Sequence, residues 1–473
     1  MSASFSIIGS ILQCNQFWVN NEIDPISDHR AGHAARPIHP RRFTVTATRN
    51  DESRSLARTL SPTRDYWRVG FLAMALATAS IPIYIHLPSF AASRLGLTLG
   101  QVGTILLAIR MVDFLQDPLL GWMTDRYSHR IARLASAGLI ALSVGSLMVF
   151  AIAPIGPVAL WLVAGLLVTF TGYSLGTILL YGQSATFAAN ASPNEQLNLS
   201  GVREMGVLIG VTLGAAGPTL LAGFSDADQG YAPFGIAIAL LALAALLVSA
   251  PLWAKAQPKN MRLDWSGIIG SGAGWLLALA FVNNLPVAVT STLFLFFVED
   301  RLALPAMAGP FLILFFVAAG VSAPFWSRIT QRLGARRVLP VSMTLAIVSF
   351  IGAFLLPEGA TAAFALICLA SGVALGADMV ILSALFAANL QRAGRQAGQA
   401  FGLWNFSTKA TLAIAAGVVL PFLQSAGYEP GETNSADALA ALNMSYALLP
   451  CALKILAIAL VLIMPRRILD TRS

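Results

Sequence analysis

Apolar segments long enough to cross a membrane recur along most of this chain, and they constrain its fold more than any other feature. A spanning helix needs roughly 20 residues, and segments of about that length or longer begin at Trp67 and continue almost to the end of the chain. Because lipid offers the backbone no hydrogen-bond partners, single spanning segments must be helical. The sequence predicts an all-α membrane protein with twelve transmembrane helices. The expected spans are 67–91, 98–122, 131–153, 157–187, 202–223, 231–253, 267–297, 306–327, 337–356, 360–389, 399–425 and 440–464.

The loops between these segments alternate in charge, which indicates how the chain is oriented. Basic loops lie toward the cytoplasm in multi-pass proteins. We therefore expect a protein of the cytoplasmic (inner) membrane with both termini in the cytoplasm. For the same reason we interpret the formal net charge of +8 as orientation and expect no nucleic-acid partner. The basic loops contain Arg126, Arg130 and Arg133; Lys255, Lys259 and Arg262; Arg328, Arg332, Arg336 and Arg337; Arg392 and Arg395; and Arg466 and Arg467.

The first 65 residues differ from the rest because they are polar and rich in arginine and histidine. Segments of this composition cannot bury enough apolar surface to fold, so we expect 1–65 to be a disordered cytoplasmic tail. The three cysteines are far apart and predict neither a disulfide framework nor a metal site. After the tail we expect an N-terminal six-helix bundle at 66–254, a cytoplasmic linker at 255–266, and a C-terminal bundle with a short tail at 267–473.

An internal repeat supports this division. PLLGWMTDRYSHR, from Pro118, aligns with PFWSRITQRLGAR, which begins 206 positions later at Pro324. Both copies follow the second span of a six-span half. Two parallel six-helix halves joined by a polar linker are the layout of the major facilitator fold, in two pseudo-symmetric halves.

Charged residues interrupt the second apolar segment. Asp113 and Asp117 are four residues apart and share one helix face, and Arg110 belongs to the same stripe. A charge at mid-bilayer costs about 2.5–3.5 kcal/mol on insertion scales, so such a stripe must face the bundle interior or water. Two neighbouring carboxylates suit a sodium ion or a proton. The alternative is a buried ion pair that only holds helices together.

The sequence resembles a known transporter family at several motifs. RMVDFLQDPLLG is similar to the R-x-x-D-x-x-x-D-P-x-x-G pattern of the melibiose permease family, the glycoside–pentoside–hexuronide:cation symporters. TLFLFFVEDRL and AGQAFGLWNFSTKATLAIAAG also resemble that family. The following loop resembles the facilitator superfamily's gating motif, G-x-x-x-D-R-x-G-x-R/K. The motif's residues here are Gly121, Asp125, Arg126 and Arg130, with Ser128 in place of the second glycine.

This resemblance implies roles for several residues. Asp113 and Asp117 would bind the coupling cation, with Ser174 assisting and Lys409 lying close to them. Arg203 would help to organise the sugar site. Melibiose permease holds its sugar with carboxylates on spans one and four, and those positions correspond to Ala77 and Thr177 here. The cation half of the site therefore looks retained, whereas the sugar half is rewritten.

Other polar residues lie deep in the predicted spans, and each allows two interpretations. Lys409 either neutralises the carboxylates in the empty state or reaches the cytoplasmic interface. Asp378 either binds substrate or forms a structural bridge with Lys454. Asn283 and Asn284 either line a sugar-sized cavity or bridge helices.

The sequence predicts a secondary active transporter that couples sodium or proton uptake to symport of a sugar, glycoside or related small solute. Alternatives are proton-coupled transport of an organic anion, a drug or a lysolipid, and a transporter-shaped sensor. We expect a monomer in the lipid bilayer, with no cofactor besides the coupling ion. An enzyme is not expected, because the GxSxG string at Gly172–Gly176 lies inside a span and lacks a strand–turn–helix elbow.

Overall fold

The computed structural model describes residues 65–80, 86–87, 90–91, 94–188, 192–222, 230–254, 272–393, 397–430 and 434–469. The predicted tail, apart from its last residue, and the predicted linker lie outside this part of the chain. Contacts divide the chain into Met1–Leu56 and Ala57–Ser473. The helices below all belong to the second unit.

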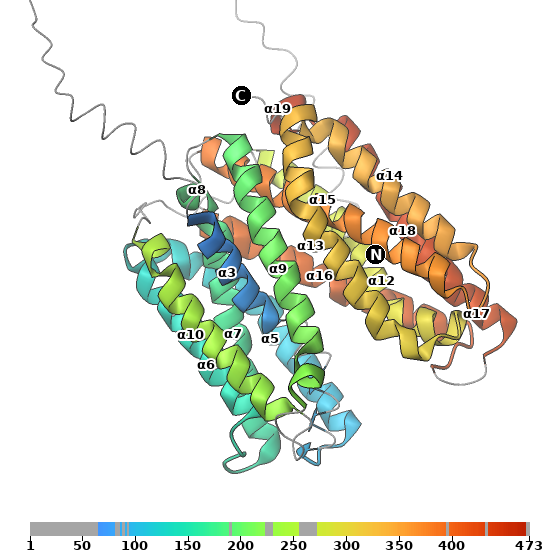
Figure 1. Ribbon diagram of the computed structural model, residues 1–473, viewed down its shortest axis with the longest axis horizontal. Coiled ribbons are helices and arrows are strands. Elements are labelled where there is room, and N and C mark those ends of the chain that lie inside the picture. The colour runs from blue at the N-terminus through green and yellow to red at the C-terminus, as the bar shows by residue number, and fades with distance from the viewer. Residues whose placement is uncertain are drawn as a thin grey trace, which may run out of the picture. The chain divides into compact units, whose positions relative to one another are not determined.

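The described residues form an all-helical membrane protein (Figure 1). Its long helices are α3 (Tyr66–Thr78), α5 (Leu99–Arg126), α6 (Ile131–Phe150), α7 (Val158–Gly182), α9 (Pro193–Leu221), α10 (Tyr231–Trp253), α12 (Gly274–Phe296), α13 (Ala308–Leu333), α14 (Ala335–Phe354), α15 (Thr361–Arg392), α16 (Ala397–Ser425) and α18 (Leu449–Ile463). The short helices α8 (Ser184–Phe187), α17 (Ala436–Asn443) and α19 (Arg466–Leu469) complete the set used here.

Ten helical segments among the described residues are long and apolar enough to cross a membrane. The two other predicted spans correspond to α3 and α5. The described part of α3 has 13 residues, and the 28-residue α5 contains the three charged residues of the second span. The all-helical membrane fold is therefore confirmed, whereas the number of twelve spans stays a prediction.

Local capping explains where two of the functional helices begin. Thr98 accepts a hydrogen bond from the backbone N–H of Gln101, whose side chain in turn accepts from the backbone of Thr98, so α5 begins with a reciprocal cap. Ser192 caps α9 in a similar way, with Pro193 in the first turn. These caps satisfy N–H groups that have no partner within the helix.

The helices follow the internal repeat. Moved along by 206 positions, the bounds of α5 become 305–332, and Pro305–Leu333 is helical. The bounds of α9 become 399–427 in the same way, which closely matches α16. The repeat read in one loop therefore extends to the placement of whole helices.

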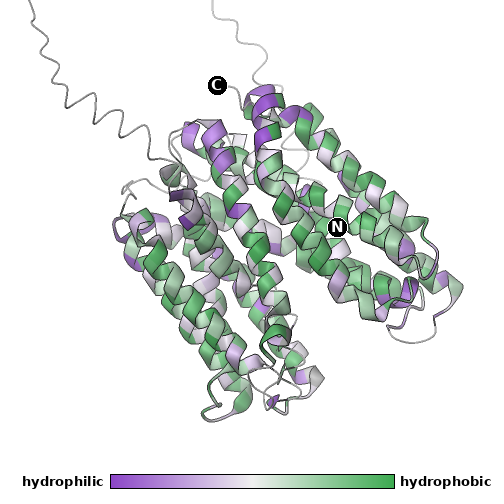
Figure 2. Cartoon of the chain, in the orientation of Figure 1, coloured by the Kyte–Doolittle hydropathy of each residue, from purple (hydrophilic) through white to green (hydrophobic). Residues whose placement is uncertain are grey.

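The apolar side chains gather into separate cores. One core uses buried residues between Tyr66 and Trp253, and two others use buried residues between Ala273 and Leu469. The helices of the first group contact those of the second mainly through α5 with α16, α9 with α13 and α9 with α15. Figure 2 shows that hydrophobic residues dominate the middle of the helices, as contact with lipid requires.

Candidate functional site: a cavity between the two helix groups

A cavity of about 320 Å³ lies between the two groups of helices. Residues from α3, α5, α7 and α9 line it from the first group, and residues from α12, α15 and α16 line it from the second. Ligand pockets in proteins typically range from about 300 to 1,000 Å³. The cavity is therefore large enough for a small solute. Its charged lining residues are Arg110, Asp113, Glu204, Asp378 and Lys409.

Four residues form a charged cluster that joins the two helix groups at this cavity. Lys409 of α16 places its Nζ 2.7 Å from Asp113 Oδ1 and 2.8 Å from Asp117 Oδ2. Ser174 of α7 donates a hydrogen bond to Asp113 Oδ1 over 3.0 Å and accepts one from Lys409 over 2.9 Å. The residues expected at a cation site thus lie together. We refer to Asp113, Asp117, Ser174 and Lys409 as the inter-half cluster.

Asp117 is the most enclosed member of this cluster. Its side chain is fully buried, and unlike Asp113 it does not line the cavity. The ion pair with Lys409 reaches one carboxylate oxygen, and Oδ1 has no hydrogen-bond partner within the described residues. A buried carboxylate oxygen without a partner is costly. Asp117 Oδ1 is therefore an unsatisfied acceptor of this cluster within the described residues.

The helix packing explains how Lys409 reaches carboxylates on another helix. Where α16 crosses α5, Gly402 faces the backbone oxygen of Asp117, and a Cβ at Gly402 would lie 2.7 Å from that oxygen. Gly121 contacts Gly398 at the same crossing, where a Cβ at Gly121 would lie 2.7 Å from the Gly398 oxygen. Only glycine permits such an approach. The close crossing brings the lysine, two turns beyond Gly402, within reach of both carboxylates.

The expected solute-binding residues Thr177, Asn283, Asn284 and Asp378 all line the cavity. Thr177 accepts a hydrogen bond from Asn405 of the other helix group over 3.3 Å. The wall also includes Ala77, which occupies one of the positions where the related sugar permease has a carboxylate. The predicted solute residues Thr177, Asn283, Asn284 and Asp378 therefore share a single cavity.

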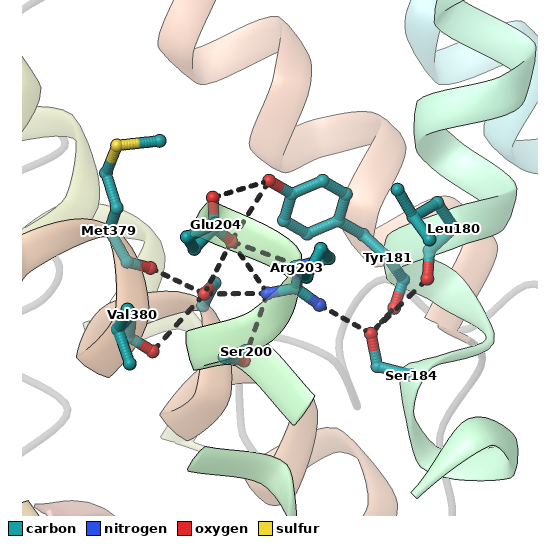
Figure 3. Close-up of polar contacts among 9 residues, drawn as sticks. Leu180, Tyr181, Ser184, Ser200, Arg203, Glu204, Met379 and Val380 are labelled. Atoms are coloured by element: carbon teal, nitrogen blue, oxygen red, sulfur yellow. Dashed lines mark hydrogen bonds and ion pairs between the residues drawn. The ribbon is translucent and has the colours of Figure 1, made fainter. Parts of the chain in front are cut away.

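Arg203 differs from the expectation because it does not line the cavity. Its side chain is fully buried and forms an ion pair with Glu204 at 2.9 Å (Figure 3). The guanidinium also donates hydrogen bonds to Ser184 and Ser383, each over 2.8 Å. Ser383 belongs to α15, so this network connects the two helix groups. Glu204 stands between Arg203 and the cavity, and an effect of the arginine on solute must pass through such neighbours.

The residues of the gating motif lie at the end of the helices where α5 is followed by α6, α13 is followed by α14, and the short helix α19 begins. We call it the arginine-rich end. Asp125 accepts hydrogen bonds from the backbone N–H groups of Gly398 and Gln399, over 3.1 and 2.7 Å. These N–H groups belong to the first turn of α16, where a carboxylate is favoured. Arg126 and Arg130 are exposed.

The corresponding position in the second repeat copy behaves differently. Gln331 donates a hydrogen bond to Asn198 in α9 over 2.6 Å. The first turn of α9 already contains Ser192 as its cap and Glu195 as an acidic residue. A neutral amide therefore takes the place of Asp125. Both contacts join the helix groups at the arginine-rich end.

Sequence reasoning missed Tyr173, Tyr181 and Ser383, which line the cavity. The hydroxyl of Tyr181 donates to Glu204 over 3.0 Å, and its ring lies 3.9 Å from the Arg203 guanidinium carbon. The spacing of Tyr181 from Ser174 and Thr177 was a usable signal, because positions four and seven apart share a helix face. Ser383 had no comparable signal, since it belongs to a different helix.

Solved structures support the fold. Two structures of a bacterial homologue of the iron transporter ferroportin, one in an outward-facing state and one in that state with soaked iron, each give a TM-score of 0.62. Each has 15% sequence identity and covers 83% of this chain; the matched shares of the two chains are 99% and 98%. This likeness shows the fold alone. No curated protein matches the chain.

A family model matches the sequence itself over most of its length. The matched residues are 67–465, which begin at the first predicted span and include every residue of the inter-half cluster. A membrane transporter fits the all-helical fold, the apolar helices and the cavity between the two helix groups. The protein belongs to the family described as MFS/sugar transport protein.

Proposed function

We propose that this membrane transporter couples the uptake of sodium or protons to the symport of a sugar, glycoside or related small solute. The observation that carries the proposal is the inter-half cluster. Two buried carboxylates share one lysine in it, and one carboxylate oxygen has no hydrogen-bond partner within the described residues. The ion-paired groups thus hold one negative charge in excess when both acids are ionised. A bound cation or proton would remove that excess.

The chemistry of the cluster suits a small hard cation. Carboxylate and hydroxyl oxygens are ligands that sodium accepts, and Asp113, Asp117 and Ser174 supply them. A proton on either carboxylate would remove the same excess charge. Lys409 would act as the internal counter-ion when the site is empty. Cation binding would then weaken the hold of Lys409 on α5 and link loading to the contact between the halves.

The cavity next to the cluster supplies the solute site. Thr177, Asn283, Asn284 and Asp378 provide hydroxyl, amide and carboxylate groups on its walls. Trp404 also lines the cavity and offers an apolar face. Polar groups combined with an aromatic face suit a hydroxylated ring. Arg203 would act behind Glu204, by holding the wall rather than by touching solute.

Alternating access would follow from breaking and reforming contacts between the halves. At the arginine-rich end the halves are joined by Asp125 with α16 and by Gln331 with Asn198. Opening that end requires both contacts to separate. We propose that this end faces the cytoplasm, with both termini on that side. Single cysteines in loops 126–133 and 328–337 should therefore resist an impermeant thiol reagent added to intact cells.

The proposal is tested by combining binding with transport. Purified protein is screened by thermal shift against neutral sugars, glycosides and organic acids, in sodium chloride and in choline chloride and at several pH values. A binding solute stabilises the fold by mass action. Solutes that bind are then tested for accumulation in proteoliposomes under an imposed sodium or proton gradient. Binding without any gradient-driven accumulation would contradict symport and favour a sensor.

One observation favours a second candidate, the proton-coupled transport of a non-sugar solute. The positions that carry the sugar carboxylates in melibiose permease correspond to Ala77 and Thr177, and both residues line the cavity. The sugar contacts of that permease are therefore not reproduced. Stabilisation by an organic anion, a drug or a lysolipid, with none by sugars, would select this candidate.

A further inference from the structure

A second buried ion pair lies at the wall of the cavity, entirely within the C-terminal helix group. Lys454 of α18 contacts Asp378 of α15 over 2.5 Å and Asn283 of α12 over 2.6 Å. The hydroxyl of Ser342 of α14 lies 3.4 Å from the other oxygen of Asp378, but it donates over a shorter distance, 2.9 Å, to the backbone oxygen of Leu339. Asp378 and Asn283 line the cavity, whereas Lys454 does not and is only 2% exposed. We call Lys454, Asp378, Asn283 and Ser342 the wall cluster.

Lys454 fixes the orientation of the Asn283 amide. An ammonium group only donates hydrogen bonds, so the atom it contacts on Asn283 must be the amide oxygen. The NH₂ group of that amide is then left to donate elsewhere. Because Asn283 lines the cavity, the lysine behind the wall makes this residue a hydrogen-bond donor toward solute.

A second chain of hydrogen bonds fixes the neighbouring amide in the opposite sense. Thr408 donates its hydroxyl proton to the backbone oxygen of Trp404 over 3.0 Å, so it accepts from Asn284. The Asn284 NH₂ group supplies that hydrogen bond, over 3.3 Å. Its amide oxygen is left as an acceptor. The two asparagines thus differ in their free groups: Asn283 keeps its NH₂ group, whereas Asn284 keeps its amide oxygen and one N–H.

Asp378 adds an acceptor with capacity to spare. A carboxylate offers about four lone-pair positions, and Lys454 occupies one of them. This wall therefore has one amide donor, one amide acceptor and one carboxylate acceptor. Hydroxyl groups, which donate and accept, match all three.

We propose that Asp378 and Asn283, positioned by Lys454, form a hydroxyl-recognition wall that selects neutral polyhydroxylated solutes over their acidic counterparts. A solute carboxylate only accepts hydrogen bonds, so Asp378 and the Asn284 oxygen would both repel it here. This inference rests on the proposed function. It assigns the protein carboxylate that binds solute to Asp378, in the half of the protein opposite to Ala77 and Thr177. Two cationic residues also line the cavity. Lys409 is held by two carboxylates, and Arg110 lies on α5, in the other helix group from the wall cluster.

The test compares matched neutral and acidic probes on purified protein. The probes are glucose with glucuronate and galactose with galacturonate, each measured by thermal shift titration in the presence of sodium at neutral pH. We expect the wild type to bind the neutral member of a pair about tenfold more tightly. Asp378→Asn should weaken neutral binding and narrow the preference to about threefold or less. It leaves Lys454 buried with a neutral acceptor in place of its counter-ion, so the melting temperature of this variant is measured beside its binding.

Two further variants separate recognition from structural support. Asn283→Asp retains the oxygen that Lys454 contacts but removes the NH₂ donor. It should weaken the binding of both probes, and the binding of the acidic probe should weaken more. The double variant Asp378→Asn/Lys454→Met removes the pair without leaving a buried charge, and the neutral-to-acid ratio should fall in it. The single variant Lys454→Arg keeps a cationic donor beside Asp378, and its ratio should lie between those of the double variant and the wild type. A role that is only structural would change the melting temperature and leave this ratio untouched.

A control variant and two outcomes complete the design. Glu195 accepts a hydrogen bond from the Tyr66 hydroxyl over 2.5 Å and does not line the cavity. Glu195→Gln should therefore leave the ratio of neutral to acidic binding unchanged. If folded Asp378→Asn and Asn283→Asp bind the probes with the wild-type ratio, the recognition wall is refuted and the proposed function stands. If neither the neutral nor the acidic sugars bind the wild type, the sugar-transport proposal itself is contradicted.

Discussion

The inter-half cluster and the wall cluster border the same cavity, yet they differ in what they join and in how their charges balance. The inter-half cluster connects α16 to α5 and α7 across the two helix groups, and one lysine serves two carboxylates. The wall cluster stays within the C-terminal group, and one lysine serves one carboxylate and an amide. The second cluster is neutral as it stands, whereas the first has an excess negative charge.

The comparison indicates that a buried lysine–carboxylate pair does not have one fixed role in a membrane protein. A balanced pair within one rigid group has no reason to change during transport, so it can hold a wall in shape. An unbalanced group that bridges two moving halves can respond both to a cation and to their separation. The following predictions test this contrast.

The largest expected effect is on energy coupling. Asp117→Asn should lose most cation-driven accumulation, by about 5- to 150-fold, the usual range of a coupling free energy between two sites. Downhill exchange should persist, because the solute residues lie mainly on other helices. Asp378→Asn should weaken solute binding but keep its cation dependence. Accumulation and exchange are measured with the same proteoliposomes, and normal accumulation by Asp113→Asn/Asp117→Asn would refute the cation site.

The next effect concerns stability when either lysine is removed. Lys454→Met leaves Asp378 buried without its partner, which should cost about 3–5 kcal/mol of the free energy of unfolding. Sodium should not restore that loss. Lys409→Met leaves two carboxylates that a cation can neutralise, so sodium should recover part of the lost stability. Thermal unfolding in sodium chloride and in choline chloride measures this, and an equal sodium response in both variants would remove the contrast.

A smaller effect is expected at the serine of the inter-half cluster. Ser174 contacts both Asp113 and Lys409, and it supplies one oxygen to the proposed cation site. Loss of one hydrogen bond to a charged group should weaken apparent cation affinity about fivefold or more in Ser174→Ala. The measurement is the cation concentration that gives half-maximal solute uptake. Unchanged affinity would place the cation elsewhere.

The smallest effect is expected at the serine of the wall cluster. Ser342 lies 3.4 Å from Asp378 and donates its proton to the backbone oxygen of Leu339 over 2.9 Å, so its contact with Asp378 contributes little. Ser342→Ala should change the free energy of unfolding by about 0.5 kcal/mol or less and leave cation affinity unchanged. Denaturant unfolding together with cation titration of uptake checks both. A cation defect as large as that of Ser174→Ala would mean that the two clusters act as one.

Much of the fold followed from the sequence because it depends on local patterns. Apolar length predicts spanning helices, and the repeat at Pro118 and Pro324 predicts the correspondence of α5 with α13. The spacing of Asp113 and Asp117 predicts a shared face for the same reason, since it depends only on the period of one helix. The number of twelve spans is harder to predict from the sequence, because a charged helix such as α5 gives a weak apolar signal.

Contacts between distant residues were decided by tertiary structure. The sequence marks Lys409 as deep in a span, but its reach to Asp117 depends on the close glycine crossing at Gly402. Arg203 was expected near solute, and its burial behind Glu204 depends on Ser383, which is 180 positions away. No periodicity along one helix carries such information.

The sequence by itself determined that this chain forms spanning helices in two related halves and places two carboxylates on one interior stripe. Backbone hydrogen bonding in lipid and helical periodicity impose those features locally. Tertiary structure alone decided which lysine serves which carboxylate, and therefore which cluster is balanced. It also set the polarity of Asn283 through Lys454, which lies 171 positions away. The physical reason is that charge balance and amide orientation depend on neighbours in space, which helix packing brings together.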